Sequence, residues 1–425
     1  MRRQTSYILG QRSNQTDNTV TFGVSKQTAR RHTYIIGKSG TGKSTLLRNL
    51  IVQIIANKQG LILIDPHGDL SEEIMDCIPP HRVKDAIYLN PQDIEYPMGL
   101  NLLGNVPQDG HDKVTEDIIS IFKSIWGDSW GPRMEYILRN SLYALLDIPG
   151  STLLGVSRLF HDDRYRRAVT QRIKNPAVQS FWHTEFPGYI ADRRHREYVS
   201  PIENKLGRLT SNLIIRNMIG QTKNRIKMRE CMDSGKIIIA NLAKGALGDG
   251  VSSLLGSFLV SMTQQAAMSR RDMPERYRRD FYLVADEYHN FTTESFTSIL
   301  SEARKYRLNL VLAHQYISQV PEAIQDAVFG NVGSMISFQI GAQDSQRLAS
   351  EFDNEWPARQ FVELQPYEVI AKLTEHSKMS QPFLGKTLPP IEYSFEKKQA
   401  IMNQTRANYC MHRNVIEDKL NRTIF

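Results

Sequence analysis

The chain has 425 residues, of which 40% are hydrophobic and 23% charged, and its formal net charge is +8 at pH 7. These proportions are typical of a folded globular protein and exclude disordered and collagen-like chains. The length predicts two or three domains and is sufficient for a hydrophobic core without disulfide bonds. The positive charge permits a polyanionic partner such as nucleic acid, but does not identify one.

The sequence shows no signal for a membrane or for secretion. No stretch approaches the roughly 18 uninterrupted apolar residues that a membrane-spanning helix needs. The basic residues near the N-terminus are not followed by the apolar segment of a secretory signal. The three cysteines, Cys77, Cys231 and Cys410, are far apart and form no CxxC pair. We therefore expect a protein without an intrinsic membrane span that works in a reducing cytoplasm.

Seven short apolar runs predict strands that are buried on both faces. Val and Ile are prominent in them, Gly, Asp or Asn bounds them, and their apolarity is continuous rather than alternating. This pattern is typical of parallel strands in a sheet that is covered by helices on both sides. The predicted strands are Thr33–Ile36, Leu61–Ile64, Ala86–Leu89, Lys236–Ala240, Phe281–Ala285, Asn309–Ala313 and Met335–Ile340.

Helical patterns alternate with these strands and predict a doubly wound α/β core. The alternation stops between residues 101 and 233, where long amphipathic patterns predict an inserted all-α domain. We expect residues 1–100 and 234–390 to form the two parts of the core, and residues 391–425 to form a helical tail. The predicted helices are Ser44–Asn57, Val114–Ile125, Met134–Leu146, Leu254–Met268, Thr293–Tyr306 and Asp344–Phe352.

A glycine-rich segment between the first strand and the first helix fits the pattern GxxxxGK[ST] without a mismatch. A strand before it and an amphipathic helix after it are the context of a P-loop. Glycines let backbone N–H groups turn inward around a phosphate, and the helix N-terminus adds a partial positive charge. We expect ATP and Mg²⁺ as cofactors, with Lys43 at the β- and γ-phosphates and Ser44 at the metal. The nucleotide-binding residues are Gly37, Lys38, Ser39, Gly40, Thr41, Gly42, Lys43, Ser44 and Thr45.

Two acidic residues follow the apolar strand Phe281–Ala285. Together with a P-loop, this arrangement predicts a metal-supporting carboxylate and a general base. Asp286 would hold Mg²⁺ through water, and Glu287 would orient and deprotonate the attacking water.

Two further polar residues are candidates for the catalytic cycle. Gln315 follows the strand Asn309–Ala313 and could sense the γ-phosphate, although a solvated strand end would look the same. Arg304 lies near the end of a predicted helix and could be an arginine finger that reaches the nucleotide of the next subunit. Cations at a helix C-terminus are also favourable by themselves, which gives a purely structural alternative.

Several segments together resemble a known superfamily of motor ATPases. The P-loop is common to many NTPases, whereas Asp65-Pro66-His67-Gly68-Asp69 and the run from Glu302 to Gln315 are more specific. Further matching segments are residues 31–36, 101–103, 241–245, 286–291, 329–333 and 381–383. On these residues the chain resembles the HerA/FtsK superfamily of ring-shaped DNA-pumping ATPases. Within it, the chain most resembles the TraG/TraD-type coupling ATPases of conjugation and type IV secretion.

The resemblance implies a RecA-like core, a homohexamer, and ATP-driven movement of double-stranded DNA through a central pore. It also implies that Arg304 acts in trans and that Gln315 is the sensor. The chain departs from the pattern in two ways. Coupling proteins usually begin with transmembrane helices, which this sequence lacks, and they often have Asp-Pro-Lys-Gly where this chain has Asp65-Pro66-His67-Gly68.

Basic residues on loops are the candidates for DNA contact, which would be independent of sequence and sensitive to salt. Lys244 lies in a Gly-rich segment after a core strand, which is either a pore loop or an ordinary strand-to-helix turn. Arg193, Arg194 and Arg196 rank first among the other clusters, because the helical insertion faces one mouth of the ring in the resembled family. The cluster Arg276, Arg278 and Arg279 is interpreted as a solvated face.

The sequence therefore predicts an ATP-hydrolysing ring motor that translocates double-stranded DNA, as in conjugation, type IV secretion or a related mobile-element process. A relaxase, a secretion channel or a nuclease would be the partner. Two alternatives remain open: a secretion or pilus-assembly ATPase with protein cargo, and an ATPase scaffold subunit of a nuclease or defence complex.

Overall fold

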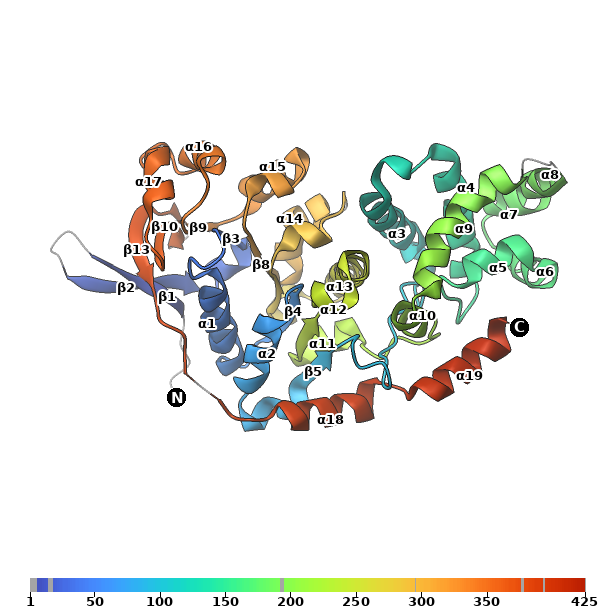
Figure 1. Ribbon diagram of the computed structural model, residues 1–425, viewed down its shortest axis with the longest axis horizontal. Helices are drawn as coiled ribbons and strands as arrows, with labels where there is room; N and C mark the ends of the chain where they lie inside the picture. The colour runs from blue at the N-terminus through green and yellow to red at the C-terminus, as the bar shows by residue number, and fades with distance from the viewer. Residues whose placement is uncertain are drawn as a thin grey trace. The chain divides into compact units, whose positions relative to one another are not determined.

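A computed structural model of the chain describes residues 6–13, 18–191, 195–294, 296–375, 378–392 and 394–424 (Figure 1). The chain folds into two compact units. Unit 1 consists of residues 1–90, 228–245 and 259–405, and unit 2 consists of residues 91–227, 246–258 and 406–425. In the ranges described, no helix is both long and apolar enough to cross a lipid bilayer.

Unit 1 is built on an eleven-stranded sheet with the order β2-β1-β13-β10-β9-β3-β8-β7-β4-β6-β5. The strands from β9 to β5 are parallel to their neighbours, whereas those from β2 to β10 pair in antiparallel fashion, as β10 does with β9. A short hairpin, β11 (Thr374–Glu375) with β12 (Lys378–Met379), lies outside this sheet. The strands of the sheet are β1 (Ser6–Ser13), β2 (Thr19–Ser25), β3 (Thr33–Ile36), β4 (Gly60–Asp65), β5 (Ala86–Leu89), β6 (Ile237–Asn241), β7 (Phe281–Ala285), β8 (Leu308–His314), β9 (Ser334–Ser337), β10 (Glu368–Lys372) and β13 (Phe383–Thr387).

The parallel part of the sheet confirms the predicted fold class. Each of the seven predicted strands is present there, and every residue of these strands is buried. Continuous apolarity in the sequence therefore corresponds to burial on both faces. The four strands of the antiparallel part were not predicted. β1 and β2 mix buried with exposed positions and carry several polar residues, so they lack that continuous signal.

Helices α1 and α2 pack against one another and against one face of this sheet (Figure 1). Leu46 and Leu50 of α1 join a buried cluster with alternate strand residues such as Leu63 and Ile239, as the period of two in a strand requires. The helices that lie wholly or partly in unit 1 are α1 (Lys43–Ala56), α2 (Asp69–Asp76), α11 (Met228–Ser234), α12 (Lys244–Leu247), α13 (Asp249–Ser269), α14 (Phe296–Glu302), α15 (Glu322–Asn331), α16 (Ala342–Glu351), α17 (Ala358–Glu363) and α18 (Lys398–Tyr409).

One predicted helix is divided in the structure. The pattern at Thr293–Tyr306 predicted a continuous helix, but α14 begins at Phe296 and ends at Glu302. The chain then tightens into the 3₁₀ turn η9 (Ala303–Tyr306), which is followed by Arg307 in the left-handed region at φ +58°. A tightened last turn is a common way for a helix to satisfy its final carbonyl groups. Arg304 therefore belongs to a turn and not to a regular helix.

Unit 2 is predominantly helical. Phe181, Trp182 and Phe186 are buried in it, and the indole of Trp182 donates a hydrogen bond to the carbonyl of Asn140 at 3.2 Å. Residues Phe181–Glu185 form a π-helical segment between α7 and α8. Apart from the parts of α12, α13 and α18, its helices are α3 (His111–Trp126), α4 (Pro132–Leu146), α5 (Gly155–His161), α6 (Asp163–Thr170), α7 (Pro176–Ser180), α8 (Phe186–Ala191), α9 (His195–Ser211), α10 (Leu213–Ile219) and α19 (Arg413–Ile424).

Candidate nucleotide site

Three parallel strands of unit 1 bring the predicted site residues to one edge of the sheet. β8 lies between β3 and β7, with Ile36 opposite His314 and Ala285 opposite Leu312. The residues that follow these strands are Gly37, Gln315 and Asp286. Because parallel strands end at the same edge, the loop after β3, the polar end of β8 and the acidic end of β7 converge there.

The loop after β3 has the backbone conformation of a phosphate-binding turn. Gly40 and Gly42 adopt φ angles of +79° and +112°, and α1 begins at the next residue, Lys43. The hydroxyl of Thr41 donates to the carbonyl of Lys38 at 2.7 Å and closes the turn. Ser44 lies exposed in the first turn of α1. The glycines are needed for their positive φ angles, which residues with a side chain rarely adopt.

Neighbouring strands also fix this loop. The N–H of Gly37 donates to the carbonyl of His314 at 3.3 Å, and the N–H of Lys38 donates to the carbonyl of Gln339 at 2.9 Å. Tyr367, which no sequence motif indicates, donates its N–H to the carbonyl of Thr41 at 2.8 Å. Its ring lies so close to Gly42 that a Cβ there would be 2.7 Å from the ring. The antiparallel part of the sheet thus supports the loop from one side.

Lys43, Glu287 and Gln315 form one contact cluster. The Nζ of Lys43 donates to Oε1 of Glu287 at 2.9 Å, and the Nε2 of Gln315 donates to the same oxygen, also at 2.9 Å. The side chains of Lys43 and Glu287 are only 7% and 4% exposed. A buried ion pair of this kind depends on both partners, because removal of either leaves an unpaired buried charge.

Glu287 is held in an unusual conformation. Its φ and ψ angles of +46° and +49° are in the left-handed region, which costs about 1–3 kcal/mol for residues other than glycine. Its N–H donates to Oδ1 of Asp286 at 3.0 Å, and the amide of Asn290 donates to its carbonyl at 2.8 Å. Its second carboxylate oxygen, Oε2, makes no hydrogen bond within the described residues, and Nδ1 of His289 is 3.4 Å away. One acceptor of this carboxylate therefore remains available.

Asp286 is buried beside the cluster. Burial raises the pKa of Asp286 to about 6, while the nearby Lys43 ammonium lowers it and the carboxylates of Glu287 and Asp65 raise it. The carboxylate of Asp65, at the end of β4, instead accepts backbone N–H groups from His67, Gly68 and Ser71 at 2.8–2.9 Å. Asp65 therefore orders the start of α2, whereas Asp286 is the carboxylate that would gain from a nearby cation.

His314, at the end of β8, is a buried structural residue. Its Nε2 lies 2.7 Å from the hydroxyl of Tyr34. Burial lowers the pKa of His314 to about 3, so this imidazole is neutral near pH 7. It supports the backbone that positions Gly37 and Gln315 but carries no charge to the site.

Arg304 is the predicted site residue that makes no contact with this cluster. It lies exposed on the turn η9, and within the described part of the chain its side chain forms no hydrogen bond or ion pair. No described contact joins it to Lys43, Asp286, Glu287 or Gln315.

The candidate DNA contacts have different positions. Lys244 donates its Nζ to Oδ1 of Asn290 at 2.6 Å, and Asn290 in turn bonds to the carbonyl of Glu287. This cation is therefore tied to the acidic end of β7. Arg193 and Arg194 lie outside the described residues, and Arg196 belongs to α9.

One protein family is similar in sequence to part of this chain. The sequence model of the family "Helicase HerA, central domain" matches residues 8–131, which include the P-loop. No protein of curated function matches the sequence significantly.

The fold is similar to that of several solved structures. The plasmid coupling protein TrwB in complex with ADP and Mg²⁺ has 15% sequence identity and a TM-score of 0.62, over 88% of this chain and 89% of that chain. A trigonal form of TrwB with sulphate gives a TM-score of 0.64 at 14% identity, over the same shares of the two chains. VirB4 of Thermoanaerobacter pseudethanolicus gives 0.55 at 14% identity, over 93% of this chain and 98% of that one. The resemblance predicted from the motifs is confirmed: the chain is similar in sequence to the HerA central domain and shares its fold with the coupling protein TrwB.

Proposed function

We propose that the chain hydrolyses ATP and, as a ring of identical subunits, uses this energy to move double-stranded DNA. The observation that carries the ATPase part is the cluster of Lys43, Glu287 and Gln315 beside Asp286, next to a loop with the backbone of a phosphate cradle. The fold is shared with TrwB, which has been solved with ADP and Mg²⁺ and with a non-hydrolysable ATP analogue.

The residues present fit ATP and Mg²⁺. The backbone turn from Gly37 to Gly42 and the ammonium of Lys43 would hold the phosphates. The exposed hydroxyl of Ser44 and the carboxylate of Asp286 would hold the metal, which supplies positive charge at the transferring phosphoryl group. The raised pKa of Asp286 belongs to a carboxylate that is buried without sufficient compensation, and a bound cation would provide it.

The ion pair between Lys43 and Glu287 indicates how the site is controlled. The ammonium of Lys43 is bonded to Glu287 at 2.9 Å, so it is not fully available to bind phosphate oxygens. When Lys43 turns to phosphate oxygens, Glu287 loses its cation and becomes free to accept a proton from water. Gln315, bonded to the same oxygen, keeps that carboxylate in place. The general base is therefore active only when the phosphate site is filled.

In the proposed mechanism, Arg304 of one subunit completes the nucleotide site of the neighbouring subunit. Its exposed guanidinium, without a partner in the described residues, is available to the nucleotide of a neighbouring subunit. An arginine supplied in trans stabilises the charge that develops on the transferring phosphoryl group. A homohexamer like that implied by the resemblance would bring each Arg304 to a neighbouring site.

DNA as the cargo is supported by the net charge of +8 and by the similarity to TrwB, a "bacterial conjugative coupling protein". The second candidate is a secretion or pilus-assembly ATPase with protein cargo, which ATP hydrolysis indifferent to DNA would favour. A scaffold role in a nuclease or defence complex is the third candidate, which stable co-purification with another enzyme would favour.

The test is ATP hydrolysis by the purified protein with and without long double-stranded DNA, at low and moderate salt, with Lys43→Ala as the blank. We expect stimulation by DNA that decreases as salt rises, because phosphate contacts release counterions. Hydrolysis that is indifferent to DNA would favour protein cargo. No hydrolysis above the blank, with or without DNA, would contradict an autonomous ATPase.

A further inference from the structure

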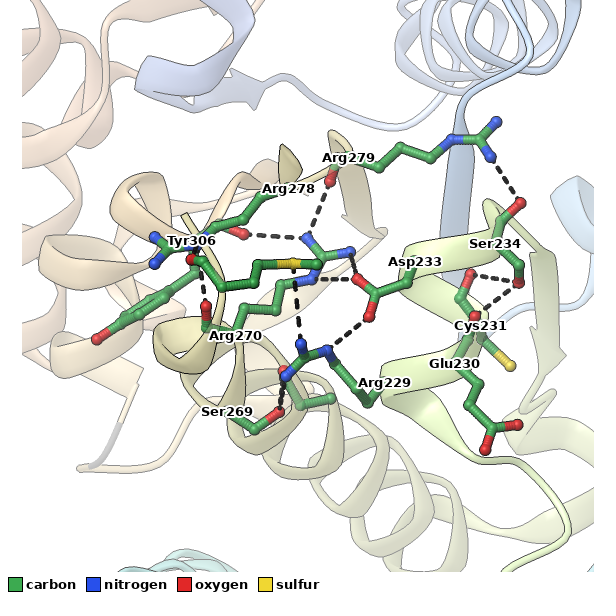
Figure 2. A network of polar contacts seen from close by, with 12 residues as sticks. Arg229, Glu230, Cys231, Asp233, Ser234, Ser269, Arg270, Arg278, Arg279 and Tyr306 are labelled. Carbon is green, nitrogen blue, oxygen red and sulfur yellow. Dashed lines mark hydrogen bonds and ion pairs between the residues drawn. The ribbon is translucent and has the colours of Figure 1, made fainter. Parts of the chain in front are cut away.

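A fully buried arginine is hydrogen-bonded to the backbone of the turn that carries Arg304. Arg270, just after α13, is 0% exposed and is the largest fully buried side chain of the described residues. Its Nε donates to Oδ1 of Asp233 at 2.9 Å, and its Nη1 donates to the carbonyls of Arg279 and Tyr306 at 2.9 and 3.0 Å (Figure 2). Tyr306 is the last residue of η9, so one guanidinium connects α11, the segment just before β7 and this turn.

A second arginine binds the same turn. Arg278 donates its Nε to the carbonyls of Arg270 and Met273 at 3.0 and 3.1 Å, and its Nη1 to the carbonyl of Lys305. Its guanidinium also lies 5.2 Å from the centre of the Tyr306 ring. This half-buried position corrects the interpretation of Arg278 and Arg279 as a solvated face. Arg279 likewise binds backbone, with its Nη1 donating to the carbonyl of Ser234.

Charges around the network compensate its burial. The other oxygen of Asp233, Oδ2, accepts a hydrogen bond from Nε of Arg229 at 2.6 Å (Figure 2). Arg229 also donates to Asp272 at 2.9 Å. At the far end of the turn, the N–H of Arg307 donates to the carbonyl of Arg304 at 3.1 Å, and the Arg307 side chain lies 3.4 Å from Glu275. The carbonyls of the three consecutive residues Arg304, Lys305 and Tyr306 are all bonded, while the Arg304 side chain is not.

We propose that Arg270 and Arg278 are positioning residues that fix the η9 backbone and so present Arg304 to the nucleotide of a neighbouring subunit. This inference rests on the proposed trans role of Arg304. A flexible arginine is an effective catalytic group only if its backbone is held, because a displacement of about 1 Å can cost on the order of 100-fold in rate. Two guanidiniums on adjacent carbonyls provide that constraint without using the side chain of Arg304.

The experiment is a double-mutant cycle between Arg278 and Arg304, with ATP hydrolysis by the assembled full-length protein as the readout. Arg278 is chosen because it is only partly buried and its hydrogen bonds go to backbone carbonyls, so its removal breaks no buried ion pair among the described residues. We expect Arg278→Ala to lower kcat about tenfold with an unchanged KM for ATP, because its backbone constraint acts on the trans residue and not on the P-loop. Arg278→Lys should recover part of the loss, since an ammonium can bind one carbonyl.

The decisive variant is Arg278→Ala combined with Arg304→Ala. If Arg278 acts through Arg304, the double variant is no slower than Arg304→Ala alone. The matched control is Arg276→Ala, on the same segment, where the exposed guanidinium lies 4.9 Å from the centre of the Tyr277 ring. This control should leave kcat unchanged. Thermal unfolding and ring assembly of each variant verify that the fold is intact.

Two results would overturn the inference. Losses that multiply in the double variant would show that Arg278 acts by another route, and an unchanged kcat in a folded Arg278→Ala ring would show that the constraint is unnecessary. Neither result would contradict the proposed ATPase activity of the chain. Full activity of Arg304→Ala would instead remove the trans role itself, and this inference would fail with it.

Discussion

The strand-end cluster and the η9 turn are two halves of one proposed site, and they are built in opposite ways. Lys43 and Glu287 are buried, bonded to each other and complete within one chain. Arg304 is exposed, and its side chain has no partner among the described residues, although the carbonyls of its turn are bonded. In the strand-end cluster, Lys43 and Glu287 already bond to each other within one chain. In the η9 turn, the backbone carbonyls are bonded, but the Arg304 side chain has no described contact with a group of the cluster. This difference is what the proposed role of Arg304 at the site of a second copy of the chain would require.

The largest expected effect is that of Arg304→Ala, which removes the half supplied in trans. An arginine finger contributes about 10³-fold or more to kcat, so hydrolysis should nearly disappear while ATP binding by each subunit is kept. A fluorescent nucleotide titration and a steady-state assay measure the two quantities. Lys305→Ala, with an exposed side chain on the same turn, is the matched control. Equal losses in the two variants would show that the turn as a whole matters and not its arginine.

Glu287→Gln tests the half that is complete within the chain. The amide cannot accept the proton of water, so kcat should fall by about 10²- to 10⁴-fold. ATP affinity should be kept or rise, because the competing ion pair with Lys43 becomes a weaker neutral contact. Glu322→Gln, on the exposed start of α15, serves as the control. A kcat of the Glu287→Gln variant close to that of the wild type would refute the assignment of Glu287 as the general base.

Gln315→Ala separates positioning from chemistry within the same cluster. Loss of the 2.9 Å bond to Glu287 removes one restraint on the carboxylate, which can still accept a proton. A hydrogen bond to a charged group contributes about 1.5–3 kcal/mol, so we expect a loss of about 10- to 150-fold in kcat. Ser318→Ala, exposed just beyond this strand, is the control. A loss as large as that of Glu287→Gln would mean that Gln315 has a direct catalytic role.

The smallest expected effect concerns stability around the Arg304 turn. His32 is buried, with its Nε2 3.2 Å from the carbonyl of Leu300 in α14, and its Nδ1 accepts the N–H of Leu310 at 3.1 Å. Burial lowers the pKa of His32 to about 4, and the nearby Arg304 contributes in the same direction. The folded state therefore binds fewer protons at His32 than the unfolded state does below pH 6.5.

This contribution to stability is fully present above pH 6.5 and is lost as the pH falls towards 4. It amounts to about 3 kcal/mol at most. Denaturant unfolding of the wild type and of His32→Gln across this range measures it, and the variant should show the weaker pH dependence. Asp286, whose pKa is raised to about 6, acts in the opposite direction but cancels in the comparison. Parallel curves for the two proteins would exclude His32 as a source of the pH dependence.

The two halves also differ in how far the sequence predicts them. Strands with continuous apolarity and a glycine pattern with a fixed spacing are local signals, so the parallel sheet and the P-loop conformation were predictable. The bond from Lys43 to Glu287 joins residues 244 positions apart and follows only from the strand order. Nothing in the sequence distinguishes a solvated arginine from one that binds backbone carbonyls, and Arg278 was therefore misinterpreted.

The most direct test of the central claim is complementation between two inactive variants. Lys43→Ala lacks the phosphate cation but keeps Arg304, and Arg304→Ala has the reverse defect. If the arginine acts in trans, random mixing at equal amounts restores both groups at about a quarter of the interfaces in a closed ring. ATP hydrolysis by subunits mixed before assembly should then clearly exceed that of either variant alone. Activity that stays at the level of the separate variants would contradict a site shared between subunits.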